Sequence, residues 1–226
     1  MSVDPDGGRP AGPSFLTDPG IYRRFRAVAE RRPAVFLDRD GVVVEEVGYL
    51  HKREDVRFID GALQSIAGFN RQGWIVVLVT NQAGIARGYY GWDAFESVQQ
   101  AIEIALEAHG GWFDGIWACG YHSEGSGPLA EANHPFRKPN PGMILDALTV
   151  LPIDAAASWL VGDKVCDLEA ACRAGLAGAV HVRTGHGPEH RSRIADLQAR
   201  FPNVNLQTAE TLADAAALLL PAQRTI

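Results

Sequence analysis

The sequence lacks several features that would place it in a specialised class of protein. No apolar run approaches the roughly 20 residues that a membrane-spanning helix needs, so we expect no membrane partner. The N-terminus has no apolar segment typical of a signal peptide, so we expect no secretory leader. Only three cysteines occur in 226 residues, without the spacing of a disulfide framework. A cytoplasmic location is the simplest prediction, because the cytoplasm keeps thiols reduced.

Positive charge is also scarce. The formal net charge is −6, whereas a nucleic-acid-binding protein usually carries a basic face, so we expect no nucleic-acid partner. Of the 21 basic residues only Lys52, Lys138 and Lys164 are lysines. Where arginine is the usual cation, a lysine can mark a place that requires a compact point charge. These three positions are therefore candidates for a functional role.

Apolar residues make up 46% of the chain, enough for the core of one globular domain. Short apolar runs predict strands at 34–38, 74–80, 115–119, 158–161 and 179–182, with a short strand near 204–206. Helical spacing predicts helices at 59–72, 92–109, 143–151, 165–175, 190–200 and 209–220, and a short surface helix at 21–32. Strands that alternate with helices predict an α/β fold with a doubly wound parallel sheet.

The domain organisation follows from composition. Residues 1–20 contain four prolines and four glycines and are predicted to form a flexible N-terminal tail. Residues 21–226 show neither an internal repeat nor a break in composition. We therefore expect them to form a single domain, and the protein to be a monomer.

The most informative stretch is the apolar run at 35–37, which ends at Asp38 and Asp40 and is followed by Gly41. In parallel α/β sheets, ligands bind beyond the carboxyl ends of the strands, where these two carboxylates would lie. Taken alone, the stretch is equally compatible with a strand followed by an ordinary turn with solvated acids. The choice between the two depends on whether other residues provide partners for Asp38 and Asp40.

Polar groups follow three further predicted elements. Thr80 and Asn81 end one strand, Asp163 ends another, and Lys138 lies on a long proline-rich loop. Carboxylates gathered at one point repel each other unless a cation lies among them, and oxygen ligands suit Mg²⁺. A hydroxyl, an amide and a lysine beside the metal would bind a phosphate. The sequence therefore predicts a magnesium site for phosphoryl transfer to a carboxylate.

Four motifs carry a family resemblance: D-R-D-G at 38–41, V-T-N-Q at 79–82, R-K-P at 137–139 and G-D-K-x-x-D at 162–167. Their set and order resemble the haloacid dehalogenase-like phosphohydrolases, which implies a Rossmann-like fold. The spans between the motifs leave no room for a separate cap domain, so we expect a capless, open site. Specificity would then come from the loops.

The resemblance implies a role for each matching residue. Asp38 would be the nucleophile that forms an aspartyl-phosphate, and Asp40 the general acid and then the general base. Thr80 would bind the phosphoryl oxygens, and Lys138 would bridge the nucleophile and the phosphoryl group. Asp163 would hold Mg²⁺ together with the Asp38 carboxylate and the Asp40 backbone carbonyl.

Asp167 has two interpretations. It either supports the metal site from outside the ligand set or is an acid favoured by the N-terminus of a helix.

The stretches around the motifs are E-V-G-Y-L-H at 46–51, F-I-D-G at 58–61, T-N-Q-A-G-I-A-R-G at 80–88 and R-K-P-N-P-G-M at 137–143. They resemble those of the heptose 1,7-bisphosphate 7-phosphatases of the histidinol-phosphatase-related subfamily. Histidinol-phosphatases differ after T-N-Q, where I-A-R-G at 85–88 is not their pattern. The resemblance implies a small phosphorylated sugar as substrate, and Arg137 and Lys164 fit a second anionic group. The implied pocket residues are Glu46, Val47, Gly48, Tyr49, Thr80, Asn81, Gln82, Ala83, Arg137, Lys138 and Lys164.

Two alternatives stay open beside this function. One is the same chemistry on another monoester, such as histidinol phosphate or a nucleic-acid 3′-phosphate, although the acidic charge balance disfavours nucleic acid. The other is a binding protein on an inactive phosphatase fold. The complete set of Asp38, Asp40, Lys138 and Asp163 disfavours that second possibility.

The long loop departs from the family pattern. These phosphatases usually carry a structural zinc in the pattern C-x-H and then C-x-C before R-K. The corresponding residues here are Cys119, Tyr121, His134 and Phe136. Phenylalanine cannot bind zinc, and the mixed set of Cys119, His122 and His134 is weak as a substitute. We therefore expect no structural zinc, with Tyr121 and Phe136 holding the loop by packing.

Overall fold

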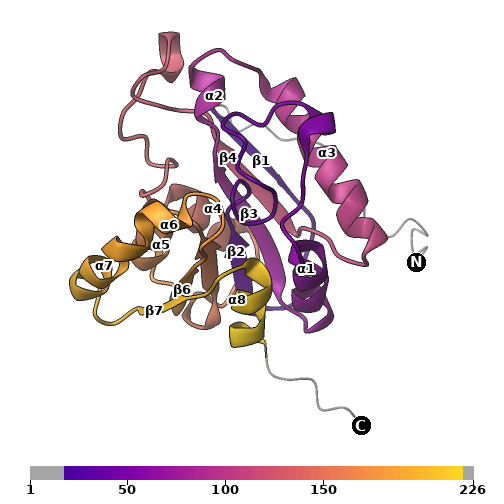
Figure 1. The fold of residues 1–226 in the computed structure, drawn as a ribbon, viewed down its shortest axis with the longest axis vertical. Helices are drawn as coiled ribbons and strands as arrows, with labels where there is room; N and C mark the ends of the chain where they lie inside the picture. Colours follow the sequence, from indigo (N-terminus) through magenta and orange to yellow (C-terminus); the bar gives the residue numbers. More distant parts are fainter. Residues whose placement is uncertain (1–17, 221–226) are drawn as a thin grey trace.

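The structure, a computed structural model, describes residues 18–220 and contains a seven-stranded sheet in the order β1-β4-β3-β2-β5-β6-β7 (Figure 1). All neighbouring strands are parallel except β1, which runs antiparallel to β4. The strands are β1 (Ile21–Phe25), β2 (Ala34–Leu37), β3 (Ile75–Asn81), β4 (Gly115–Cys119), β5 (Trp159–Gly162), β6 (Gly178–His181) and β7 (Asn205–Thr208). The predicted α/β fold is confirmed.

Helices cover both faces of the sheet. One face packs against α1 (Ala62–Arg71), α3 (Trp92–Ala108) and α8 (Leu212–Leu219). The other face packs against α4 (Gly142–Val150), α5 (Val165–Ala174) and α7 (Ile194–Arg200). Two further helices, α2 (Ala83–Ala86) and α6 (Gly187–His190), are single turns. None of the helices between residues 18 and 220 combines the length and apolar character that crossing a bilayer would require.

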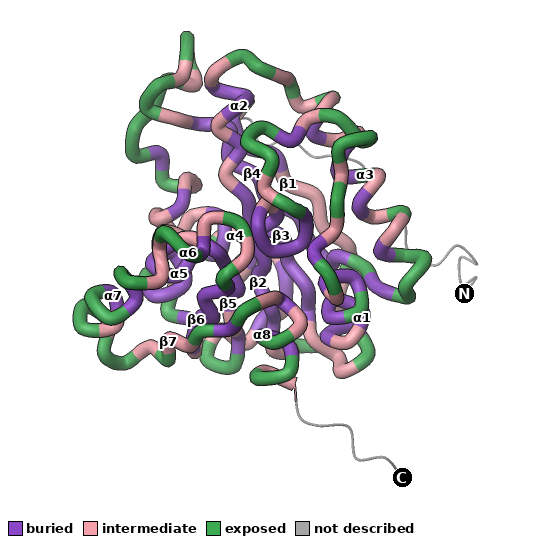
Figure 2. The backbone as a smooth tube through the Cα atoms, viewed as in Figure 1, coloured by how far each residue is buried: buried purple, intermediate pink, exposed green. Residues whose placement is uncertain are grey.

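The central strand β2 shows how the sequence builds the sheet. All four of its residues are buried, as expected for a parallel strand covered on both faces (Figure 2). Val35 and Leu37 face the core under α1 and α3, whereas Ala34 and Phe36 face the core under α4 and α5. Because β2 is buried on both faces, the sheet holds the end of this strand, and Asp38 after it, in a fixed place.

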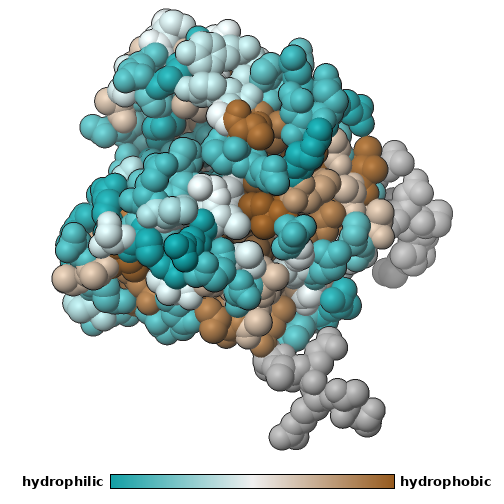
Figure 3. All heavy atoms as spheres, in the orientation of Figure 1, coloured by the Kyte–Doolittle hydropathy of each residue, from teal (hydrophilic) through white to brown (hydrophobic). Residues whose placement is uncertain are grey.

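On the outside of the molecule, hydrophilic residues cover most of the face seen in Figure 3.

The helix predicted at 21–32 is wrong, because the structure forms the edge strand β1 there. Ile21 and Tyr22 are buried, and the two arginines that follow reach acids on neighbouring helices. Arg23 pairs with Asp146 on α4 at 3.1 Å, and Arg24 pairs with Glu103 on α3. The arginines suggested a solvated helix, but they are anchored from opposite faces of a strand.

The other predicted elements lie close to the observed ones. The segment at 41–58, between β2 and α1, contains an isolated antiparallel bridge between Val44 and Phe58. Of the predicted tail, residues 1–17 lie outside the described part of the chain. Asp18 lies inside it and accepts a hydrogen bond from the Gly20 N–H at 2.9 Å.

The start of β2 depends on one buried hydroxyl, which gives a stability prediction. The Ser158 hydroxyl accepts a hydrogen bond from the Ala34 N–H at 2.8 Å and donates to the Asp154 carbonyl at 2.6 Å. Ser158→Ala leaves both backbone groups without this partner. The free energy of unfolding should fall by about 1–3 kcal/mol in urea denaturation. The control, exposed Ser123→Ala, should change it by less than about 0.5 kcal/mol, and equal losses in the two variants would contradict this role.

Candidate active site

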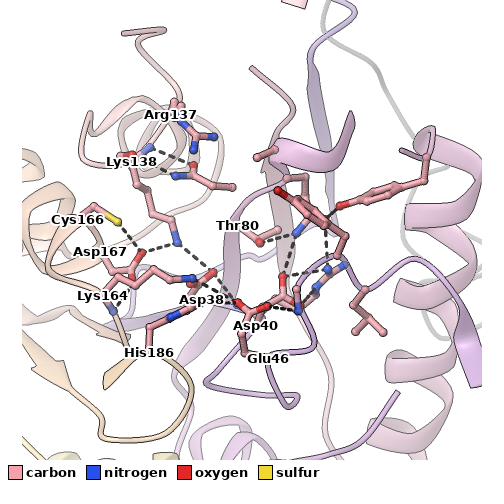
Figure 4. A pocket seen from close by; sticks show the side chains of 18 residues that line it. Asp38, Asp40, Glu46, Thr80, Arg137, Lys138, Lys164, Cys166, Asp167 and His186 are labelled. Carbon is pink, nitrogen blue, oxygen red and sulfur yellow. Dashed lines mark hydrogen bonds and ion pairs between the residues drawn. The ribbon is translucent and has the colours of Figure 1, made fainter. Parts of the chain in front are cut away.

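A cavity of about 390 Å³ lies at the carboxyl ends of β2, β3 and β5 (Figure 4). Most of the sequence-predicted site residues line it, namely Asp38, Asp40, Glu46, Gly48, Tyr49, Thr80, Asn81, Gln82, Ala83, Arg137, Lys138 and Lys164. Two predicted residues do not. Asp163 is fully buried behind the cavity, and Val47, a predicted pocket residue, is half exposed on its loop. The sheet edge therefore brings together motifs that are distant in the sequence.

Lys138 is the cation at the centre of the site. Its ammonium contacts the Asp38 carboxylate at 3.0 Å and the Asp167 carboxylate at 2.7 Å, and donates to the Val79 carbonyl at 2.8 Å. Burial acts to lower the pKa of Lys138, but Asp167 and Asp38 outweigh it and raise that pKa. The two carboxylates therefore favour the charged form of Lys138, and three acceptors fix its position.

Asp38 is positioned by the strand that precedes it. Its N–H donates to the Val161 carbonyl of β5 at 3.0 Å, which continues the pairing of β2 with β5. Its Oδ1 contacts Lys138 and also accepts from the Arg39 N–H at 2.8 Å. Both contacts use Oδ1, so Oδ2 is unpaired within residues 18–220. An unpaired carboxylate oxygen at the cavity is what a nucleophile or a metal ligand requires.

Asp163 has the properties of a metal ligand. Oxygen atoms of Asp38, Asp163 and Asp167 lie within 4.8 Å of one another. The Oδ1 atom of Asp163 is buried and has no hydrogen-bond partner among the described residues. Burial and the carboxylates of Asp167 and Asp38 raise the pKa of Asp163 to about 8. A divalent cation would provide the missing partner and relieve the repulsion, so these residues fit Mg²⁺.

The loops around Asp163 explain the glycine of D-R-D-G. Gly41 and Gly185 both have positive φ angles, +85° and +57°. A Cβ atom at either position would collide with Oδ2 of Asp163. That same oxygen accepts a hydrogen bond from the His186 N–H at 2.8 Å. Two glycines thus let two loops close over the carboxylate.

Both carboxylate oxygens of Asp167 have partners within the protein. Its Oδ1 contacts Lys138, and its Oδ2 accepts from the Lys164 N–H at 3.0 Å at the start of α5. Both sequence-based interpretations of Asp167 therefore have a structural counterpart: it supports the site through Lys138 and also caps the helix.

Asp40 is held by a buried network that the sequence did not reveal. The Arg39 guanidinium is completely buried, lies over the Phe95 ring and binds both carboxylate oxygens of Asp40, at 3.1 and 3.0 Å. The Gln82 amide N–H donates to Asp40 at 3.2 Å and to the Thr80 hydroxyl at 2.8 Å. The network therefore couples the orientation of Asp40 to that of Thr80.

Asn81 joins the second motif to the third. Its amide exchanges two hydrogen bonds of 3.1 Å with the backbone of Lys138. The loop that carries Lys138 is thereby tied directly to the end of β3.

The outer part of the cavity carries further charge. The Glu46 carboxylate lies 3.4 Å from the Lys164 ammonium and 3.6 Å from His186 Nε2. Burial acts to lower the pKa of Lys164, but neighbouring carboxylates, Asp38 first among them, raise it. Arg137 lies on the opposite loop and donates to the Tyr121 carbonyl at 2.8 Å. Cations thus lie on two sides of the cavity mouth.

Several lining residues were not predicted from the sequence: Arg39, Leu50, Tyr90, Cys166, Asp167 as a lining group, and His186. The position of Arg39 between two aspartates was the one local signal. Tyr90, whose hydroxyl donates to Gln82 at 2.7 Å, and His186 lie on loops without a recognisable pattern.

The weak zinc candidates do not assemble into a metal site. Within residues 18–220, Asp38, Asp163 and Asp167 form the one group of three or more potential ligands close enough to share an ion. Cys119 is buried, and burial raises its pKa to about 12. His122 accepts from the Glu124 N–H at 3.0 Å, and His134 from the Phe136 N–H at 3.2 Å. These residues do not fit a structural zinc.

Comparisons with known proteins agree with the geometry. A HAD-hydrolase-like family model matches residues 135–215. The D-glycero-beta-D-manno-heptose-1,7-bisphosphate 7-phosphatase of Mesorhizobium japonicum is 45% identical over 168 residues, 73% of this chain and 77% of that protein. The Escherichia coli K12 enzyme of the same name is 40% identical over 158 residues, 70% of this chain and 83% of that protein.

A solved structure is also similar. It is the D,D-heptose 1,7-bisphosphate phosphatase of B. bronchiseptica in complex with magnesium and phosphate, with a TM-score of 0.70 and 32% identity. The match covers 83% of this chain and 98% of that one.

The raised pKa of Asp163 predicts how stability responds to pH and Mg²⁺. The ordinary pKa of 3.8 applies to the unfolded chain, against about 8 in the fold. The fold therefore holds a proton that unfolding releases, and this group's contribution to stability falls as pH rises from about 4 to about 8. Mg²⁺ replaces that proton. The rise in Tm on adding Mg²⁺ to chelated protein should therefore grow across this window in differential scanning fluorimetry.

Asp163→Asn is the matched control, because its amide cannot ionise. This variant should lose the part of the pH dependence that belongs to Asp163, and with it the effect of Mg²⁺ on Tm. An Mg²⁺-induced rise in Tm that is equal at all pH values would contradict the assignment.

Proposed function

Because the chain belongs to the heptose-bisphosphate phosphatase family of haloacid dehalogenase-like hydrolases, we propose that it removes the 7-phosphate of D-glycero-D-manno-heptose 1,7-bisphosphate in an Mg²⁺-dependent reaction. One observation carries the proposal. Lys138 contacts Oδ1 of Asp38 while Oδ2 is unpaired among the described residues, and carboxylate oxygens of Asp38 and Asp163, whose Oδ1 has no partner there, lie within 4.8 Å of each other. This arrangement suits a carboxylate nucleophile that attacks a bound phosphoryl group.

In the first half of the reaction, Asp38 attacks phosphorus and forms an aspartyl-phosphate. Asp40 donates its proton to the leaving sugar oxygen as the bond from phosphorus to that oxygen breaks. Lys138 and the Thr80 hydroxyl bind the phosphoryl oxygens, and Lys138 stabilises the charge spread over them. Mg²⁺ held by Asp38, Asp163 and the Asp40 carbonyl would offset the remaining negative charge.

In the second half, Asp40 is a carboxylate and takes a proton from water. The water oxygen attacks phosphorus, the acyl phosphate bond breaks, and Asp38 and inorganic phosphate are released. The Arg39 guanidinium and the Gln82 amide bind the Asp40 side chain as a carboxylate, the form that takes the proton. Asp40 thus ends the cycle with the proton it needs for the next substrate.

The outer cations support a bisphosphate over a substrate with one phosphate. Arg137 and Lys164 line the cavity beyond the catalytic Lys138, and a second phosphate would bind there. Glu46 and Asn81, together with backbone groups of Gly48 and Ala83, would bind sugar hydroxyls. Histidinol phosphate has no second anion for these cations. A cytoplasmic location and a monomeric state stay predictions.

The direct test is hydrolysis of the bisphosphate followed by ³¹P NMR. The 7-phosphate signal should disappear while the 1-phosphate signal persists, and only with Mg²⁺ present. Asp38→Asn should abolish the reaction. Loss of the 1-phosphate first, or full activity of Asp38→Asn, would contradict the proposal.

The acid role of Asp40 predicts a dependence on the leaving group. Asp40→Asn should lower kcat/KM for the sugar phosphate by about a hundredfold to ten-thousandfold. It should lower kcat/KM far less for an aryl phosphate whose phenolate leaves without a proton. Equal losses on both substrates in steady-state kinetics would show that Asp40 is not the acid. Asp38→Asn, the control, should be inactive on both.

The outer cations predict discrimination between two substrates. Lys164→Met should raise KM for the bisphosphate by about tenfold to a hundredfold, the effect of losing one charge-assisted hydrogen bond. KM for heptose 7-phosphate should change much less, since that substrate lacks the second anion. Lys52→Met, on an exposed lysine outside the cavity, should change neither. Equal increases in KM for both substrates would show that Lys164 does not bind the second phosphate.

A further inference from the structure

A cluster on the long loop after β4 lies where the family resemblance implies zinc. Its members are Asp18 from the N-terminal segment and Tyr121, His134 and Phe136 from the loop, which we call the clasp. The Tyr121 and His134 rings stack with centroids 3.9 Å apart and an interplanar angle of 9°. The Phe136 ring centroid lies 6.0 Å from that of His134, with an interplanar angle of 46°.

Asp18 closes the clasp. The Tyr121 hydroxyl donates to its Oδ1 at 2.6 Å, and the Gly20 N–H donates to the same oxygen at 2.9 Å. Its Oδ2 lies 3.4 Å from His134 Nε2. Since His134 Nδ1 accepts from the Phe136 N–H, the ring carries its proton on Nε2, toward Asp18. One carboxylate thus serves both stacked rings.

The N-terminal segment is fitted closely to this ring pair. The Gly20 carbonyl accepts from the Gly120 N–H at 2.8 Å. A Cβ atom at Gly20 would collide with the Tyr121 ring. Tyr121 is only 7% exposed as a result. The clasp therefore joins the N-terminal segment to the start of the loop without any metal.

The clasp also holds Arg137. The guanidinium of Arg137 donates to the Tyr121 carbonyl at 2.8 Å, and its backbone N–H donates to the His134 carbonyl at 2.9 Å. The two residues that anchor Arg137, Tyr121 and His134, are therefore the stacked pair of the clasp. Arg137 lines the cavity, so a looser clasp would let this cation move relative to the substrate.

We propose that this clasp replaces a structural metal, and that Asp18 and Tyr121 are positioning residues that set the place of Arg137 at the cavity. The effect on substrate binding rests on the proposed function, whereas the order of the loop does not. Lys138 is tied independently to Asn81 and to the sheet. Loosening the clasp should therefore weaken binding and leave the chemical step nearly intact.

The experiment compares full-length Asp18→Ala and Tyr121→Phe with the wild type. Asp18→Ala should raise KM for the bisphosphate by about tenfold, the effect of one misplaced hydrogen-bond donor, with kcat changed less than about twofold. Tyr121→Phe, which keeps the stacked ring and removes only the hydroxyl, should raise KM less. Asp18→Asn retains the acceptor oxygen and should restore a KM close to the wild-type value.

Hydrogen exchange in the absence of substrate separates this inference from the proposed function. Amides at 120–141 should exchange faster in Asp18→Ala than in the wild type. Asp60→Ala, on an exposed acid that pairs with none of the residues from 18 to 220, should leave exchange in the loop unchanged. If the wild type hydrolyses no sugar phosphate, the proposed function fails while exchange still tests the clasp.

Two results would overturn the inference. One is unchanged exchange in the loop of both Asp18→Ala and Tyr121→Phe. The other is a full equivalent of zinc per chain by mass spectrometry, with chelation loosening the loop. We expect no stoichiometric zinc, and full activity once Mg²⁺ is restored after chelation.

Discussion

The buried ammonium of Lys138 is the contact on which the arrangement of the site depends. It joins Asp38 after β2, Asp167 on α5 and the Val79 carbonyl of β3. These contacts bring three segments to one point at the sheet edge. One ammonium does not balance the carboxylates of Asp38, Asp163 and Asp167, and the cluster is left with an excess of two negative charges. A buried cluster of this kind needs a divalent cation or protons. The raised pKa of Asp163 and its unpaired oxygen both reflect this excess of negative charge.

Much of the site can be predicted from the sequence, because the end of a buried strand has a recognisable pattern. An apolar run that stops at a polar residue marks a buried strand, and parallel strands deliver their carboxyl ends to one edge. Asp38, Thr80 and Asp163 could be placed by that argument alone. Lys138 follows no strand; it was a candidate because the chain has only three lysines, and the family resemblance then gave it a role. The fold was predictable for the same reason, apart from β1, whose arginines pair with helices that the local sequence does not indicate.

The residues that were missed depend on tertiary contacts. Arg39 is adjacent to both aspartates, yet its direction is set by the Phe95 ring on α3 and by Gln82. His186 reaches the cavity because Gly41 and Gly185 allow two loops to close over Asp163. The contact of Asp18 with Tyr121 spans 103 positions in the sequence. The loss of zinc ligands was visible in the sequence, but the carboxylate that joins the two rings was not.

The claim that Asp38 is the nucleophile is tested most directly by trapping the intermediate. Protein carrying Asp40→Asn, given an activated aryl phosphate, can form the aspartyl-phosphate but lacks the base that hydrolyses it. Rapid acid quench and peptide mass spectrometry should then find one phosphoryl group on Asp38. Phosphate released without any modified peptide, or a phosphoryl group on another residue, would contradict the account.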